Sequence, residues 1–151
     1  METLARGALA GLAATVPMTA VIGAGRVAGL MATPPPVEIT ENVAELAGED
    51  PDRASPEFQA AWLAAHVGYG AACGVIFAAI RPVLPRSDLA AGLLFGAAVW
   101  GVSYISLMPS LNLYPPAQDD SNQRKAVMIA AHAVFGASLA RIEHALCVSN
   151  S

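Results

Sequence analysis

The stretch FQAAWLAAHVGYGAACGVIFAAI, residues 58–80, decides the fold because it carries no Asp, Glu, Lys or Arg along its whole length. A helix needs about 20 mostly apolar residues to cross the ~30 Å hydrocarbon core of a bilayer. Three further charge-free runs occupy residues 7–25, 89–118 and 126–140. The pattern predicts an all-α integral membrane protein built as a bundle of four transmembrane helices.

The composition of the whole chain agrees with a membrane environment. Hydrophobic residues make up 55% of the 151 residues, whereas charged residues make up only 13%. Because a soluble domain usually carries about 25% charged residues, this surface cannot all face water. The net charge of −4, without a basic run, argues against nucleic acid as a partner. We therefore expect a single membrane domain over residues 1–151, surrounded by the lipid bilayer.

Local signals indicate where the helices begin and end. In the segment SPEFQ, Ser55 is a capping residue and Pro56 suits the first turn of the second helix. The sequence TPPP is expected to end the first helix, and Pro109 is expected to end the third. The predicted helices cover about residues 4–31, 58–80, 88–108 and 121–146, with a polar loop over residues 32–57.

The polar loop contains one amphipathic segment. The sequence ITENVAELAGE places Ile39, Val43 and Leu46 on one face of a helix. We expect a short interfacial helix here, with its acidic face turned toward water.

Glycines spaced four residues apart mark the expected helix contacts. Lipid tails are as apolar as leucine, so helices in a membrane associate through close packing, and a Gly-x-x-x-Gly strip bares the backbone for such packing. We expect a tight bundle with little room for an aqueous pore. The residues assigned to helix packing are Gly7, Gly11, Gly70, Gly74, Gly92, Gly96 and Gly136.

Two shared motifs predict an internal repeat. The first and third helices each open with Gly-x-x-x-Gly, and the second and fourth share His-x-x-aromatic-Gly, which begins at His66 and at His132. A two-helix unit repeated without inversion gives a parallel pseudo-twofold axis along the membrane normal. The sequence thus predicts two parallel two-helix repeats, with both histidines at similar depth and pointing into the bundle.

These two histidines are the candidate functional residues, because ionisable groups inside a span usually face the bundle interior and carry function. Three interpretations stay open. Each neutral histidine could bond a hydroxyl or carbonyl across the bundle, or the pair could line a site for a small ligand, proton or metal ion. In the third, His66 and His132 are the axial ligands of a b-type haem. Tyr69 and Tyr104 complete the candidate ligand-binding set.

Other polar and aromatic residues receive structural assignments. We expect Asp119 and Asp120 to cap the fourth helix or its approach, and Trp62 and Trp100 to act as lipid or interface anchors. Arg141, Glu143 and His144 are expected to form a solvated cap of salt bridges.

The motifs from His66 to Gly74, together with MPSLNLYPP and AAHAVFG, resemble the YagU-type family of small bacterial inner-membrane proteins. The resemblance covers roughly residues 60–146. It implies a bacterial inner membrane and supplies no established activity or catalytic residues. The Arg residues close to the span ends favour cytoplasmic termini.

The expected function is binding rather than catalysis. No Ser/His/Asp set, His-Glu-x-x-His helix or phosphate-binding loop is present in the sequence. We expect a transporter-like module or accessory subunit without a cofactor. The alternatives are a bis-histidine haem electron carrier and a purely structural subunit, and a homo-oligomer or a larger membrane complex is left open.

Overall fold

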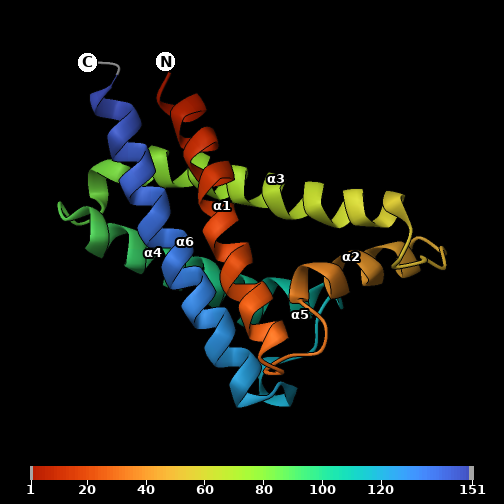
Figure 1. Ribbon diagram of the computed structural model, residues 1–151. Coiled ribbons are helices and arrows are strands. Elements are labelled where there is room, and N and C mark those ends of the chain that lie inside the picture. Colours follow the sequence, from red (N-terminus) through yellow and green to blue (C-terminus); the bar gives the residue numbers. More distant parts are fainter. Residues whose placement is uncertain (1, 150–151) are drawn as a thin grey trace.

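The computed structural model describes residues 2–149; Met1, Asn150 and Ser151, which belong to the predicted domain, lie outside the described residues. The described part contains helices and no β-strand (Figure 1). In chain order the elements are α1 (Thr3–Val27), α2 (Pro35–Leu46), α3 (Pro56–Ile80), the 3₁₀ turn η1 (Arg81–Val83), α4 (Asp88–Gly101), the π-helical segment η2 (Val102–Leu107), α5 (Met108–Ser110), the 3₁₀ turn η3 (Ala117–Asp119) and α6 (Asn122–Val148).

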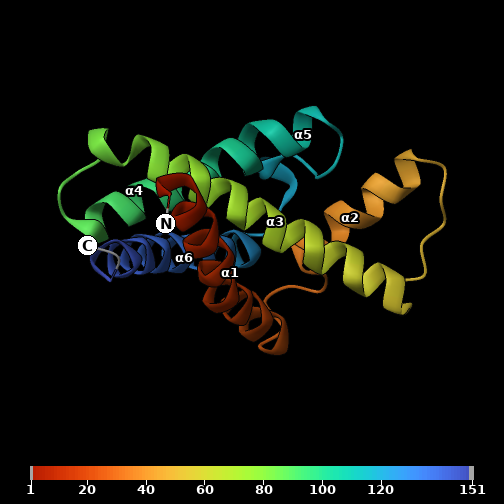
Figure 2. The ribbon, with the colours of Figure 1, turned by 90° about the horizontal axis from the view of Figure 1, so that it is seen from above.

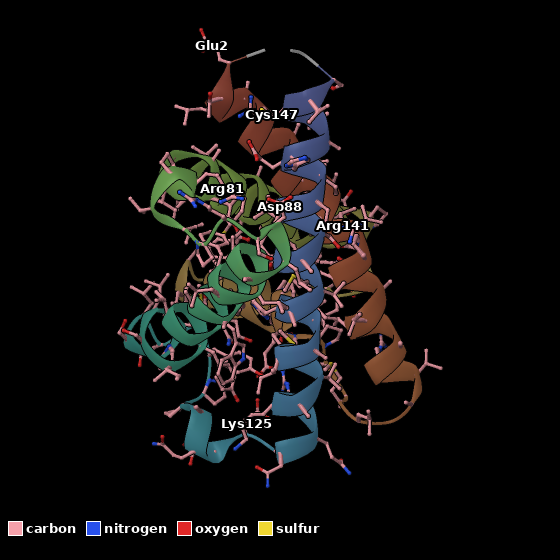
Figure 3. The ribbon with its side chains drawn as sticks, turned by 90° about the vertical axis from the view of Figure 1, so that its left-hand side faces the viewer. Glu2, Arg81, Asp88, Lys125, Arg141 and Cys147 are labelled. Atoms are coloured by element: carbon pink, nitrogen blue, oxygen red, sulfur yellow. The ribbon has the colours of Figure 1, made fainter. Side chains whose placement is uncertain are left out.

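Four stretches of these helices are long and apolar enough to cross a membrane, which confirms the all-α four-helix membrane bundle. The two chain ends lie close together at one end of the bundle, as four spans require (Figure 1). Glu2 and Cys147 mark that end in Figure 3, and Lys125 marks the opposite end. The candidate spans are Thr3–Val27, Pro56–Val83, Asp88–Ser110 and Asn122–Val148.

The bundle is organised around α6. This helix packs against both α1 and α4, and α1 packs in turn against α3. Figure 1 shows α1 and α6 running side by side, whereas α3 and α4 cross them steeply. Seen from above, α3 and α4 diverge toward the side of the molecule that holds α2 and α5 (Figure 2).

The α1–α3 contact is a direct approach of two backbones. A Cβ atom built on Gly74 would lie 2.8 Å from the Cα of Gly11 and would collide with the carbonyl oxygen of Gly7. A Cβ on Gly70 would overlap the hydroxyl of Thr15. Non-bonded carbons pack best at about 3.5–4.0 Å, so each of these positions requires glycine.

The α4–α6 contact is built in the same way. A Cβ on Gly92 would collide with the carbonyl oxygen of Gly136, and one on Gly96 with that of His132. All seven glycines assigned to packing therefore lie at helix contacts. The sequence interpretation missed Gly25, where a Cβ would lie 2.6 Å from Val127.

These contacts show which positions of α3 and α6 are equivalent, and therefore whether the two histidines are equivalent. Gly11 approaches the carbonyl of Gly70 in one pair, and Gly96 approaches the carbonyl of His132 in the other. The contacts thus align His132 with Gly70, not with His66, and the predicted equivalence of the histidines is wrong by one helical turn. The repeat itself stays a prediction.

Two predicted helix ends are wrong. Helix α1 ends at Val27 instead of residue 31, because Gly29 adopts φ +72° and the N–H of Leu30 donates to the carbonyl of Gly25 at 2.9 Å. This is a Schellman-type ending, in which glycine takes the left-handed conformation. The helix therefore stops ahead of Gly29, before it reaches the prolines that the sequence indicates as the stop signal.

The third span continues past its predicted end at residue 108. Helix α4 gives way to the π-helical segment η2, and α5 then carries the chain through Pro109 to Ser110. In an α-helix the proline ring would clash with the carbonyl four residues earlier. The wider π turn separates these groups, so the chain stays helical past the proline.

The other helix starts follow from their capping residues. The hydroxyl of Ser55 accepts from the N–H of Phe58 at 3.2 Å, and that of Ser121 accepts from the N–H of Arg124 at 3.1 Å. Such bonds satisfy N–H groups that the first helical turn leaves free. The predicted short helix in the first loop is present as α2.

The predicted solvated cap at the end of α6 is wrong for Glu143. This carboxylate is 5% exposed and accepts from Nε of Arg6 at 2.8 Å. The start of α1 packs over α6 and removes the pair from water, which spacing within α6 alone could not indicate. Nδ1 of His144 instead lies 3.2 Å from Oδ2 of Asp88, and the Arg141 side chain stays exposed.

We expect the loop that contains α2 and the connector of residues 111–121 to lie on the same side of the membrane. In a variant with Cys73→Ser and Cys147→Ser, single cysteines at Asp50, Gln118 and Glu2 would be labelled with a membrane-impermeant maleimide. Asp50→Cys and Gln118→Cys should react from the same face, and Glu2→Cys from the other. Labelling of the two loop positions from opposite faces contradicts the four-span topology.

The glycine contacts predict a large difference between two alanine variants of α3. Gly74→Ala should destabilise the bundle by ~1–3 kcal/mol or more, because the new Cβ overlaps the α1 backbone. Gly68→Ala is the matched control, since nothing lies within 4 Å of its Cβ position and alanine favours helix. Thermal unfolding in detergent measures both, and equal melting temperatures would contradict the packing assignment.

Candidate functional site

A cavity of about 250 Å³ lies between the helices in the half of the bundle that faces α2. Side chains from α1, α2, α3, α4, η2, α5 and α6 line it, and Tyr114 of the connector contributes as well. Most of the lining is apolar. The structure brings together all four residues of the predicted ligand-binding set, which are His66, Tyr69, Tyr104 and His132.

His66 bonds across the bundle, as one interpretation of the sequence predicted. Its Nε2 atom lies 3.2 Å from the hydroxyl oxygen of Thr19 on α1. The Thr19 hydroxyl donates to the carbonyl of Thr15 at 2.8 Å, so its oxygen is left to accept from the imidazole. His66 therefore carries its proton on Nε2 and keeps Nδ1 as an acceptor.

His132 behaves differently, because its partner is on its own helix. The ring is 8% exposed, and Nδ1 lies 2.8 Å from the carbonyl oxygen of Met128 one turn earlier. A carbonyl has two lone pairs and can accept this second bond besides that of the helix. Since a carbonyl only accepts, Nδ1 holds the proton and Nε2 is the acceptor. The prediction of a partner on another helix is wrong for this residue.

Tyr69 forms the rim of the cavity between α3 and η2. Its side chain is 42% exposed, and its hydroxyl lies 2.7 Å from that of Ser103. Further along the same gap, Phe77 and Phe95 meet edge to face with ring centroids 5.2 Å apart. Side chains rather than backbone thus join α3 to the α4–η2 segment.

Tyr104 is anchored at the α2 end of the cavity. Its hydroxyl donates to Oδ2 of Asp120 at 2.7 Å, and Tyr114 donates to the same oxygen at 3.2 Å. Ser121 is the residue that caps α6, and Asp120 caps the approach to the helix, because its Oδ1 accepts from the N–H of Ser121 at 2.7 Å. Burial raises the pKa of the Tyr114 phenol, so the group keeps its proton and remains a donor.

Trp100 was predicted to be a lipid or interface anchor, and the structure places it in the cavity wall instead. Its ring stacks on Tyr104 with centroids 5.5 Å apart and an interplanar angle of 18°. Its Nε1 atom is buried and has no hydrogen-bond partner among the described residues. The four-residue spacing from Tyr104 could have indicated a shared helix face.

Helix α2 covers the side of the cavity away from the termini. Pro36, Ile39 and Thr40 contribute to the lining, and Glu38 forms an ion pair with Arg124 of α6. The side-chain amide of Asn42 also donates to the carbonyl of Leu113 at 3.0 Å. These bonds fasten the helix to two other parts of the fold.

The predicted orientation of α2 is only partly right. Ile39 turns inward, but Val43 and Leu46 are 49% and 67% exposed. The acidic face does not simply meet water, since Glu41 bonds the guanidinium of Arg53. That bond holds the pKa of the Glu41 carboxyl below its ordinary value.

The described residues gather no group of three or more His, Cys, Asp or Glu side chains that could hold a metal ion. Two imidazoles on one apolar cavity are nevertheless potential ligands. The site can accept and donate a few hydrogen bonds to a bound molecule, and its walls offer apolar contact for the rest.

Residues 1–148 match a family of unknown function, DUF6789. The chain belongs to this family. No curated protein and no solved structure matches it. The family match does not test the resemblance to the YagU-type proteins, which stays a prediction.

The ion pair between α2 and α6 should hold α2 over the cavity. Glu38→Gln removes the charge that faces Arg124, and we expect amide hydrogen exchange in α2 to rise about fivefold, equivalent to ~1 kcal/mol for a partly exposed pair. Glu45→Gln is the control on the same helix, because Glu45 is exposed. Hydrogen exchange read by mass spectrometry checks this, and equal exchange in both variants would argue against the ion pair as the fastening.

Proposed function

We propose that this protein binds a small, mainly apolar molecule in the cavity beneath α2, and acts as a transporter-like module or accessory subunit rather than an enzyme. One observation carries the proposal. Two histidines and two tyrosines, His66, His132, Tyr69 and Tyr104, line one mostly apolar cavity. Polar groups inside a span are costly, and they are usually retained for a function.

The cavity size favours a compact ligand. An apolar cavity of about 150 Å³ holds a benzene molecule, and pockets for drug-sized ligands span about 300–1,000 Å³. The observed volume of about 250 Å³ lies between these limits. A molecule of one or two fused rings, or a short branched chain, has the right size.

The haem alternative retains one supporting observation, since both histidines line the same cavity. However, a porphyrin exceeds a drug-sized ligand, and the volume falls below the range for such ligands. The imidazoles also have bonds to Thr19 and Met128 that fix their rings. A purely structural role, in turn, gives no reason for two histidines to line one mostly apolar cavity.

We further propose the bacterial inner membrane as the location, with cytoplasmic termini. Arg81 and Arg86 lie in the turn between α3 and α4, and Arg81 lies closer to the end marked by Glu2 and Cys147 than to the end marked by Lys125 (Figure 3). Positive charge next to span ends favours the cytoplasmic side.

A filled cavity should abolish binding. Indane is a suitable probe, and at ten times its dissociation constant it should raise the melting temperature in detergent by about 3–6 °C. Ala65→Phe places a large ring on a lining residue and should remove this shift. Ala64→Phe is the matched control because Ala64, the neighbouring residue on α3, is exposed and is not part of the lining.

Equal shifts in both variants would contradict binding in this cavity. A Soret band in the purified protein, lost in His66→Ala and in His132→Ala, would instead support the haem alternative.

A further inference from the structure

We infer that the groove between α2 and the connector that follows α5 is a docking surface for a basic, partly apolar segment of another protein. The groove has a volume of about 610 Å³ and lies outside the cavity; among the described residues, Tyr114 alone lines both. Docking here goes beyond the proposed cavity function and does not depend on it. Three properties of the groove support it, which are its charge, its exposed apolar residues and its rigidity.

The groove is acidic. Glu38 and Glu45 of α2 are in its lining, and the described lining residues include no Lys, Arg or His. Glu38 is paired with Arg124, whereas Glu45 is exposed and forms no ion pair within the described part of the chain. The negative charge extends along the loop, because residues 37–57 hold seven acidic side chains and one arginine. A positively charged partner is therefore attracted to this surface.

The groove also offers apolar contact. Leu46, at the end of α2, is 67% exposed, and the exposed residues Pro115 and Pro116 are the connector's apolar part of the lining. All three lie in loops between the candidate spans, outside the stretches that cross the hydrocarbon core. A purely polar partner would leave these groups in contact with water, whereas an apolar residue between basic ones covers them.

The groove is held in shape before a partner binds. The side-chain amide of Asn42 donates to the carbonyl of Leu113 at 3.0 Å, which joins α2 to the connector. The ion pair between Glu38 and Arg124 joins α2 to α6. The two prolines of the lining have a fixed φ angle as well. A rigid surface loses little conformational freedom on binding, so more of the contact energy is kept as affinity.

The size of the groove and the basic residues around it indicate which partner fits. A volume of about 610 Å³ lies within the range of about 300–1,000 Å³ for drug-sized ligands, which corresponds to a short stretch of peptide rather than to one ion. Anionic lipid headgroups are repelled by the same carboxylates.

A second copy of this chain is poorly matched to the groove. Copies with one orientation in the membrane expose this acidic side together, and within residues 2–149 the one unpaired basic residue on this side is Arg26. The other basic residues there are already bonded within their own chain; they are Arg53, Arg124 and Lys125. The occupant is therefore a basic segment of a different protein.

The test measures how a short peptide amide that alternates lysine with leucine binds the purified full-length protein in phosphatidylcholine nanodiscs. Fluorescence anisotropy gives the dissociation constant after subtraction of binding to empty nanodiscs. A peptide with glutamate in place of lysine, and one with serine in place of leucine, should each bind about fivefold more weakly or worse. The first loses its charge complementarity, and the second loses its apolar contact.

Two matched pairs of variants locate the binding in the groove. Glu45→Gln should weaken binding of the lysine–leucine peptide about two- to fivefold, the range for an exposed ion pair, and Glu49→Gln should weaken it less because Glu49 is outside the lining. Leu46→Ser should weaken binding about fivefold. Val43→Ser should keep the affinity, since Val43 is exposed on the same helix but does not line the groove.

A photo-crosslinking experiment on the unmodified chain locates the peptide without any substitution. A lysine–leucine peptide with photoactivatable leucine should attach within residues 38–46 or 109–116, as read by mass spectrometry. Attachment mainly elsewhere, or equal losses of affinity within each pair of variants, overturns the docking site. Binding no stronger than that to empty nanodiscs does the same. A dimer of the free protein that the peptide dissociates would assign the groove to a second copy and overturn the inferred partner.

Discussion

The close approach of glycine backbones is the constraint on which the rest of this structure depends. Inside a bilayer, helices gain little from hiding apolar side chains, so contact distance and packing decide which helices associate. Gly7 and Gly11 meet Gly70 and Gly74 across the α1–α3 contact, and Gly92, Gly96 and Gly136 do the same between α4 and α6. Each pair touches at a crossing point and diverges beyond it. The cavity lies between the helices on the side of α2.

Polar contacts then fix the two ends of the bundle. At the terminal end the buried Arg6–Glu143 pair joins α1 to α6, and at the other end Glu38 and Arg124 join α2 to α6. Breaking a buried pair by removing one partner leaves an uncompensated charge, so such pairs set the arrangement of helices more than they add stability. Between these ends, Trp100 contributes a buried donor without a partner.

This combination is the basis of the binding function that we propose. The imidazoles of His66 and His132 are held by hydrogen bonds, and no carboxylate is among the described residues that line the cavity. General acid–base catalysis would require a reacting group positioned within hydrogen-bond reach of such a ring. A mostly apolar cavity between the helices is suited to hold a small molecule.

The sequence by itself determined the features that depend on residues near one another in the chain. Charge-free runs indicated the four spans, Ser55 indicated the start of the second helix, and the glycine spacing indicated the contact faces. The reason is physical, because transfer into lipid and helix capping are local properties. Gly29 shows that even a local signal can be misjudged when prolines follow closely.

Only the tertiary structure decided which groups face each other across the fold. It buried Glu143 against Arg6, turned Trp100 from the lipid into the cavity and aligned His132 with Gly70 instead of His66. The spacing of residues along one helix indicates which side chains share a face, but it does not indicate which other helix packs against that face. That neighbour depends on how the glycine contacts set the crossing of the helices, which no single segment encodes.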